Sequence, residues 1–143
     1  MEYSQGYFIP THPEKYVGDK DKIYYRSSWE LHFFKFLDGN PNVLKWASEN
    51  VVVHYVKPTD GQVHRYIVDI WMQHQNKHGD ISTDLVEIKP LSQSVTSKSK
   101  NHKRRLIENI QVAINHAKWD AAKKYAAKRG WNFKIVTENS IFK

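Results

Sequence analysis

The sequence predicts one mixed α/β domain in which a central β-sheet is flanked by helices. Two segments, 27–39 and 106–125, repeat apolar residues with the period of a helix. The runs between and after them are rich in β-branched and aromatic residues and are bounded by turn residues, which is typical of a largely buried sheet. The chain has 143 residues, 40% of them hydrophobic, which is enough for a single domain with its own core.

The first 25 residues are the least regular part of the sequence. Pro10, Pro13 and Gly18 interrupt them, and no sustained period is present. We therefore expect 1–25 to be an N-terminal arm lying on the domain, and 26–143 to be the single domain itself.

The first helix is expected to follow Ser27. This serine is a natural N-cap, Glu30 stands three residues later as in a capping box, and Gly39 ends the apolar pattern. Leu31, Phe34 and Leu37 fall on one face of this helix, which we expect to pack on the sheet.

Several strands are expected after this helix. The sequences "VLKWASE" and "VVVHYV" predict two short strands at 43–49 and 51–56, and "KPTDG" predicts the turn of a hairpin. Further strands are expected at 62–74, 82–90 and 131–138.

The segment 92–104 is serine-rich and basic, so we expect a mobile loop that leads into the second helix. The apolar stripe of that helix ends before Gly130. It consists of Leu106, Ile110, Ala113, Ile114, Ala117, Ala121 and Tyr125.

Charge is unevenly distributed along the chain. Residues 1–97 hold 10 Lys and Arg against 12 Asp and Glu, whereas residues 98–134 hold 11 against 2. A localised basic region is typical of proteins that bind a polyanion, most often nucleic acid. The alternative is a solvated, lysine-rich helix with no partner.

Composition excludes several classes of protein and site. The chain has no cysteine, so disulfides, thiolate metal sites and cysteine nucleophiles are excluded, and a bound metal must be held by oxygen or imidazole. No run of 18 apolar residues and no signal peptide is present, so we expect a soluble protein without membrane contact.

Charged residues interrupt two of the expected buried strands. Glu87 and Lys89 share one face of their strand because side chains alternate with period two, and Asp69 comes beside Glu87 if the two strands pair through "QNKHGD". Adjacent carboxylates repel unless a cation lies between them. A hard divalent metal, Mg²⁺ first, would satisfy the pair; a cross-strand salt bridge of Lys89 with either acid is the alternative.

An Asp in an apolar strand, followed by a hairpin and Glu-x-Lys, resembles the signature of the PD-(D/E)XK nucleases, which include many restriction enzymes. The resemblance covers roughly residues 20–138. It extends through "SSWELHFFKFLDGNPNVLKWASENVVVHYV", "DGQVHRYIVDIW", "LVEIKP" and "KWDAAKKYAAKRGWNFKIVTE". These stretches look like the endonuclease subunit of certain heteromeric transposases and, more closely, like the head completion nucleases of T-even-like tailed bacteriophages. The resemblance implies a restriction-endonuclease-like core.

The same resemblance implies roles for individual residues. Asp69 and Glu87 match the acidic metal ligands and Lys89 the catalytic lysine, with Mg²⁺ as the cofactor and Mn²⁺ as its alternative. Glu30 matches a helix-borne glutamate that completes the metal site, although its pattern also fits a capping box on Ser27. One departure is Val68, where the family usually has proline; no ligand is lost.

DNA contacts are expected outside this group. Backbone phosphates need cations without base-edge geometry, which favours the basic segment that precedes the second helix. The expected contacts are Lys98, Lys100, Lys103, Arg104 and Arg105, together with His64 and Arg65 beside the Asp69 strand.

The sequence thus predicts a metal-dependent nuclease of double-stranded DNA, with no nucleotide cofactor. The resemblance implies action in phage head completion, where packaged DNA is processed before head and tail join. Portal, neck or head proteins are the expected partners, and the host cytoplasm during assembly is the expected location, with retention in the virion left open. The alternatives are a transposase-type endonuclease subunit and a catalytically idle protein that holds DNA at the portal or neck.

Overall fold

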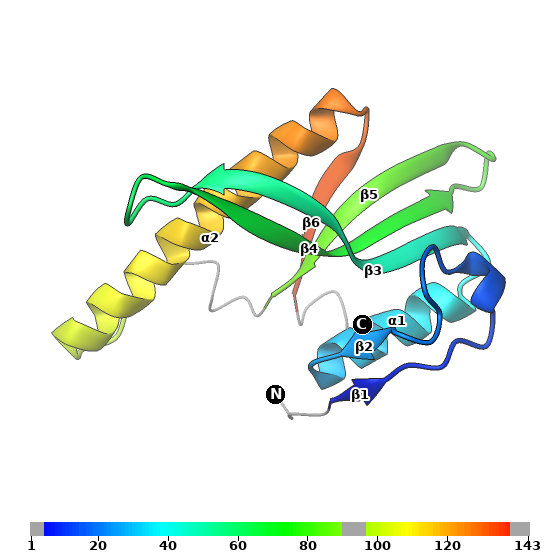
Figure 1. The fold of residues 1–143 in the computed structure, drawn as a ribbon, viewed down its shortest axis with the longest axis horizontal. Helices are drawn as coiled ribbons and strands as arrows, with labels where there is room; N and C mark the ends of the chain where they lie inside the picture. The colour runs from blue at the N-terminus through cyan, green and yellow to red at the C-terminus, as the bar shows by residue number, and fades with distance from the viewer. Residues whose placement is uncertain (1–4, 90–96, 138–143) are drawn as a thin grey trace.

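A computed structural model describes residues 5–89 and 97–137 of the chain. Its centre is a four-stranded mixed sheet in the order β3-β4-β5-β6 (Figure 1). The sheet strands are β3 (Val43–Val56), β4 (Val63–Gln75), β5 (Ile81–Ile88) and β6 (Asn132–Val136). The other elements are β1 (Gly6–Tyr7), the short 3₁₀ turn η1 (Pro13–Lys15), β2 (Tyr24–Tyr25), α1 (Ser28–Gly39) and α2 (His102–Lys128). The predicted mixed α/β class is confirmed.

Helix α1 forms where the sequence predicts it. The Ser27 hydroxyl accepts a 3.2 Å hydrogen bond from the backbone N–H of Glu30, which caps the first turn. Phe34 and Leu37 are fully buried, whereas Phe36 points to solvent. The capped, amphipathic helix therefore docks its apolar face on the sheet.

Strands β3 and β4 form one long antiparallel hairpin. The prediction of two short strands at 43–49 and 51–56 is wrong, because β3 is continuous and contains a β-bulge instead of a break. Ser48 pairs with Ile70 and Val51 pairs with Val68, so two residues of β3 lie opposite Asp69 alone. One of these is Glu49, whose φ is 53°, in the left-handed region that one residue adopts in some types of bulge.

The parallel pair β5 and β6 is joined through α2, which supplies the long connection that parallel strands need. The expected loop 92–104 ends earlier than predicted, because α2 begins at His102. Residues 90–96 of that loop lie outside the described part of the chain. Leu106 and Ile110, the first two residues of the predicted apolar stripe, are 62% and 41% exposed. The first turns of α2 extend past the sheet, which leaves these side chains uncovered (Figure 1).

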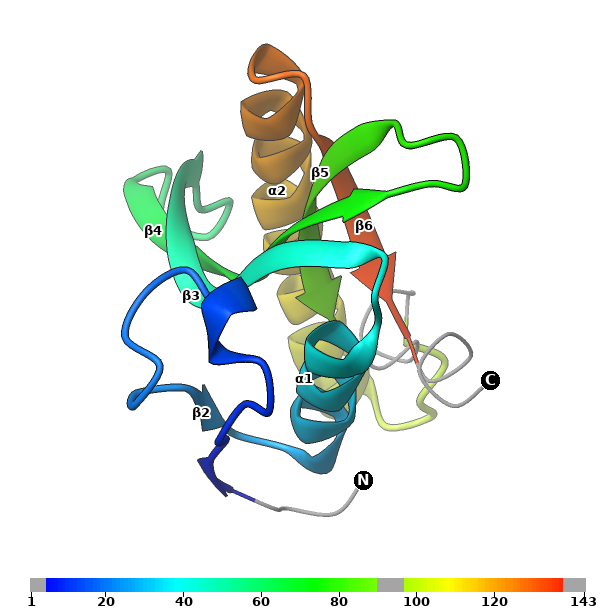
Figure 2. The same ribbon diagram turned by 90° about the vertical axis from the view of Figure 1, so that its right-hand side faces the viewer.

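The sheet separates two apolar layers. On β5, Val86 packs with α1 and Leu85 packs with α2, so the two helices cover opposite faces (Figure 2). The N-terminal segment contributes Phe8 and Ile23 to the α1 layer. Neither helix of the described chain is apolar enough to cross a membrane.

Strand β4 changes layers at Asp69. Tyr66 and Val68 belong to the α2 layer, yet Ile70 and Met72, two and four residues further on, belong to the α1 layer. A flat strand would keep all four on one face. The bulge opposite Asp69 bends the hairpin at this point, which places Asp69 at the crossing of the two layers.

Candidate active site

Asp69 lies where the pairing between β4 and β5 ends. Ile70 and Val86 are the last partners of that ladder, and beyond them the strands separate. The Asp69 carboxylate occupies the gap, where its Oδ2 accepts a 2.8 Å hydrogen bond from the backbone N–H of Ile88. The bulge and the end of the ladder thus aim one carboxylate at β5.

Glu87 is the second acid of the site and is 6% exposed. Its Oε2 accepts a 2.8 Å hydrogen bond from the Tyr66 hydroxyl, and its Oε1 lies 4.0 Å from Nζ of Lys89. Asp69 is close enough to share a hydrogen bond with the Glu87 carboxyl. The structure therefore brings together Asp69, Glu87 and Lys89, as the alternation of side chains predicts.

The two carboxyls carry more negative charge than their surroundings compensate. Burial, and then the charge of Glu87, raise the pKa of Asp69 well above its usual value, against the opposing effect of the Ile88 N–H. Burial also raises the pKa of Glu87, although Lys89 and Tyr66 partly offset it. Without a cation the two acids therefore tend to share a proton.

A third acid on the same sheet shows what full compensation looks like. Asp84 is also buried, but it is bonded to His74 at 2.8 Å, Lys134 at 3.0 Å and Asn132 at 3.1 Å. Burial alone would raise the pKa of Asp84, but these three partners outweigh it and lower that pKa. The charge of Asp84 is therefore balanced within the protein, whereas the charges of Asp69 and Glu87 are not and could be balanced by a bound cation.

Glu30 reaches the same region from α1. Its Oε1 accepts a 3.3 Å hydrogen bond from the backbone N–H of Arg26, so the carboxylate helps to cap the helix. Burial raises the pKa of Glu30, and the charge of Glu87 adds to that increase. Glu30 in turn raises the pKa of Asp69, so its charge acts on the acidic pair as well as on the helix.

The donor set fits a hard divalent cation. Within the described residues no three His, Asp or Glu side chains are arranged around one ion position. Asp69 and Glu87 remain as two adjacent carboxylates, and Mg²⁺ prefers one or two carboxylates with its other positions left to water and phosphate oxygens. The ion pair of Lys89 with Glu87, at the 4.0 Å limit, leaves Asp69 without a cationic partner of its own among the described ion pairs.

Sequence reasoning missed the place of Lys118 in this site. Lys118 is half-buried on α2, with its Nζ 5.7 Å from the centre of the Tyr66 ring and 5.9 Å from that of Tyr55. Burial and the charge of Lys89 lower its pKa, and Glu87 opposes them. A signal was available, because Lys118 stands four residues after Ile114 on the buried face of the helix.

The predicted DNA-binding residues lie apart from the acidic group. Lys98 and Lys100 are exposed in the segment before α2, and the next three cations lie in its first turn. Two of these already have partners: Arg104 bonds Glu108 at 2.7 Å and Arg105 bonds His102 at 2.8 Å. Lys103 is exposed.

The two predicted contacts on β4 lie near the tip of the hairpin. His64 is bonded to Asp60 at 2.8 Å within the tip turn. Arg65 is exposed and pairs in register with His54 of β3. Neither has a described bond to Asp69 or Glu87, so both remain predicted phosphate contacts at a distance from the acids.

Comparison with known proteins identifies the family to which this chain is similar. The family model described as TnsA-like endonuclease N terminal matches residues 40–138. The Head completion nuclease of Enterobacteria phage T4 is 38% identical over 147 residues, which cover 99% of this chain and 95% of that protein. Asp69, Glu87 and Lys89 lie within the segment that the family model matches, and Glu30 precedes it.

Proposed function

The chain belongs to the TnsA-like endonuclease family, and on that premise we propose that it is a Mg²⁺-dependent deoxyribonuclease acting in phage head completion. Its mixed sheet with flanking helices is the restriction-endonuclease-like fold of such enzymes. The observation that carries the proposal is the pair Asp69 and Glu87, two adjacent acids of which only Glu87 has a lysine nearby, Lys89 at 4.0 Å.

Each side chain of the group has a separate task. Asp69 and Glu87 would hold the cation, Mg²⁺ or alternatively Mn²⁺, which when bound lowers the pKa of a water and polarises a phosphate oxygen. The Ile88 N–H and the Tyr66 hydroxyl fix the orientation of the two acids. Lys89, held beside Glu87, places its ammonium where it can orient the attacking water or stabilise charge that develops on the phosphate.

Glu30 has a more distant task in this proposal. Its carboxylate adds negative charge to the site of Asp69, and we propose that it accepts a hydrogen bond from a metal-bound water. Its hydrogen bond to the Arg26 backbone holds it at the start of α1.

The proposed substrate is duplex DNA. Lys98 and Lys100 are exposed just before α2 and Lys103 in its first turn, and the start of α2 extends past the sheet (Figure 1). The first turn of α2 contains no acid, so its cations stand at the positive end of the helix dipole. This arrangement opposes helix stability and favours an anionic partner, which supports contact with backbone phosphates.

The similar phage protein supports a proposal for where this activity is used. The similar T4 protein is a head completion nuclease, and almost the full length of both chains is aligned. We therefore propose that this chain processes packaged DNA before head and tail join, alongside portal, neck or head proteins in the host cytoplasm. The near-complete alignment favours this role over that of a transposase subunit, and the uncompensated acids favour an active enzyme over an idle DNA-holding protein.

Digestion of linear and circular duplex DNA tests the proposal. We expect cleavage with Mg²⁺ and none in EDTA, with Ca²⁺ supporting little cleavage because its looser coordination positions water poorly. Asp69→Ala should abolish cleavage, and Lys89→Ala should lower turnover while metal binding persists. If both variants cleave normally and only lose thermal stability, the group is a structural salt bridge and the proposal is wrong.

A further inference from the structure

Lys118 reaches the active site from a different element than Lys89. Helix α2 packs on β3, and the Lys118 side chain lies over two aromatic rings, Tyr66 and Tyr55. Tyr66 is the residue whose hydroxyl bonds Glu87. One ring therefore carries the hydrogen bond to the catalytic acid and also lies beneath the ammonium of Lys118.

The ammonium of Lys118 has no carboxylate partner within ion-pair distance in the described part of the chain. It interacts with the charges of Lys89, Glu87, Lys57 and Asp69, in decreasing order. Lys89 and Lys57 oppose its placement, whereas the acids Glu87 and Asp69 favour it. A half-buried ammonium with no ion-pair partner of its own is costly, and a bound anion would offset that cost.

We propose that Lys118 is a second phosphate-binding lysine of the site, which holds the backbone phosphate next to the one that is cleaved. The inference deepens the proposed nuclease function and rests on it. The carboxylates and Lys89 surround the reacting phosphate, and the Tyr66 ring separates Lys118 from that position. A DNA strand that passes over Glu87 would present its neighbouring phosphate to Lys118.

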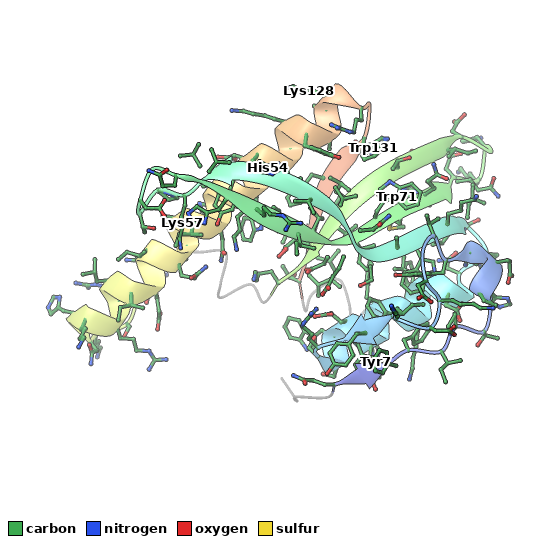
Figure 3. All side chains as sticks on the ribbon, in the orientation of Figure 1. Tyr7, His54, Lys57, Trp71, Lys128 and Trp131 are labelled. Carbon is green, nitrogen blue, oxygen red and sulfur yellow. The ribbon has the colours of Figure 1, made fainter. Side chains whose placement is uncertain are left out.

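Lys57 continues the same track. It lies at the end of β3, in the hairpin that reaches over α2, and its charge acts on Lys118 (Figure 3). The charges of Lys89, which lies beside Glu87, and of Lys57, which follows β3, both act on Lys118, so the proposed track runs from Lys89 through Lys118 to Lys57. The rings of Tyr66 and Tyr55 lie beneath the ammonium of Lys118.

A purely structural role for Lys118 makes a different prediction. In that case the lysine would only pack on the tyrosines, and its removal would disturb folding or the orientation of Tyr66. Methionine keeps the unbranched apolar stem and removes the charge, whereas arginine keeps the charge and its ability to bind phosphate. Lys118→Met and Lys118→Arg therefore separate packing from phosphate binding.

The experiment measures binding of a fluorescent 20-base-pair duplex as a function of salt. All proteins carry Asp69→Asn so that the DNA stays intact, and circular dichroism checks that each is folded. The control is Lys128→Met, which removes the same charge from α2 about 15 Å further along the helix (Figure 3).

We expect Lys118→Met to weaken binding about tenfold near 0.1 M salt and to make the slope of log K against log salt shallower by about 0.9. Lys118→Arg should restore both, and Lys128→Met should change neither by as much as half. With Asp69 intact, Lys118→Met should raise KM for DNA more than it lowers kcat. An unchanged salt slope, or a loss confined to kcat, overturns the inference.

A failure of arginine to restore binding would also overturn it, because shape and not charge would then be responsible. Failure of the proposed function gives a different result. In that case the wild-type protein does not cleave duplex DNA with Mg²⁺, whereas failure of the inference alone leaves that cleavage intact and gives Lys118→Met the same salt slope as its parent.

Discussion

The hydroxyl of Tyr66 donates a 2.8 Å hydrogen bond to Oε2 of Glu87, across two strands that are no longer paired at that point. Both residues are buried. The bond fixes one oxygen of Glu87, so the other faces Lys89 and the cation position. In metal sites generally, removal of a group that orients a metal ligand lowers metal affinity by about 10- to 100-fold (~1–3 kcal/mol).

Tyr66→Phe should therefore lower the affinity for the metal without abolishing cleavage. The Mg²⁺ concentration for half-maximal cleavage should rise on the order of tenfold, because Glu87 loses its fixed orientation. Tyr55→Phe is the matched control, since Tyr55 also lies beneath Lys118 but has no described bond to Glu87. Equal shifts in the two variants would assign the effect to packing in the α2 layer.

Asp69→Asn should stabilise the metal-free protein while it abolishes cleavage. The folded-state pKa of Asp69 is raised above its ordinary value of 3.8. The stability contributed by its neutral form is therefore fully present below pH 3.8, and it is lost as the pH rises through the raised pKa. Asparagine does not ionise, so the gain should grow between pH 4 and pH 8, to about 1 kcal/mol. Urea unfolding in EDTA at several pH values measures it.

Asp84→Asn should behave in the opposite way. The folded-state pKa of Asp84 is lowered, so its charged form contributes stability above the ordinary value of 3.8, and this is lost only as pH falls through the lowered value. At pH 7 the variant should lose about 1–3 kcal/mol, because His74, Lys134 and Asn132 lose their anionic partner. If both variants changed stability in the same direction, the distinction between the two acids would be wrong.

Glu30→Gln should separate the two roles of Glu30. The amide oxygen of glutamine can still accept from the Arg26 N–H, and the Ser27 cap uses only the backbone of residue 30, so α1 should stay intact. The lost charge should lower metal affinity and turnover. Ser27→Ala is the matched control, which should cost about 1 kcal/mol of stability without changing metal affinity. A stability loss in Glu30→Gln with unchanged cleavage would leave Glu30 as a capping residue only.

Neutralising Lys98, Lys100, Lys103, Arg104 and Arg105 should weaken DNA binding about equally for every sequence. Each lost phosphate contact should make the salt slope shallower by about 0.9, with smaller effects at Arg104, which already pairs with Glu108. Cleavage at saturating DNA should survive. Removal of the exposed Lys20 and Lys77 is the control, and an unchanged slope after loss of all five cations would place the DNA track elsewhere.

Local rules were sufficient to predict much of this molecule. The Ser27 cap and the period of α1 marked the first helix. Alternation placed Glu87 and Lys89 on one face of β5, and the β4–β5 hairpin placed Asp69 beside Glu87. These features depend on neighbours in sequence or on one hairpin. The family resemblance that the same residues predicted is confirmed by the matches reported above.

Features that depend on long-range packing were not predictable in the same way. The bulge opposite Asp69 gives Glu49 a positive φ, although glutamate is not a residue that favours it. The exposure of Leu106 and Ile110 depends on where the sheet ends, which no local pattern encodes. Lys118 reaches Tyr66 only because α2 packs on the bent hairpin.

Direct titration of metal into the DNA-free protein tests the central claim, that Asp69 and Glu87 together hold a divalent cation. Calorimetry with Mn²⁺ should show a binding site in the wild-type protein and in the control Asp120→Asn, whose exposed acid lies on α2. The double variant Asp69→Asn, Glu87→Gln should show no binding at that site while remaining folded. Unchanged Mn²⁺ affinity in the double variant would contradict the account.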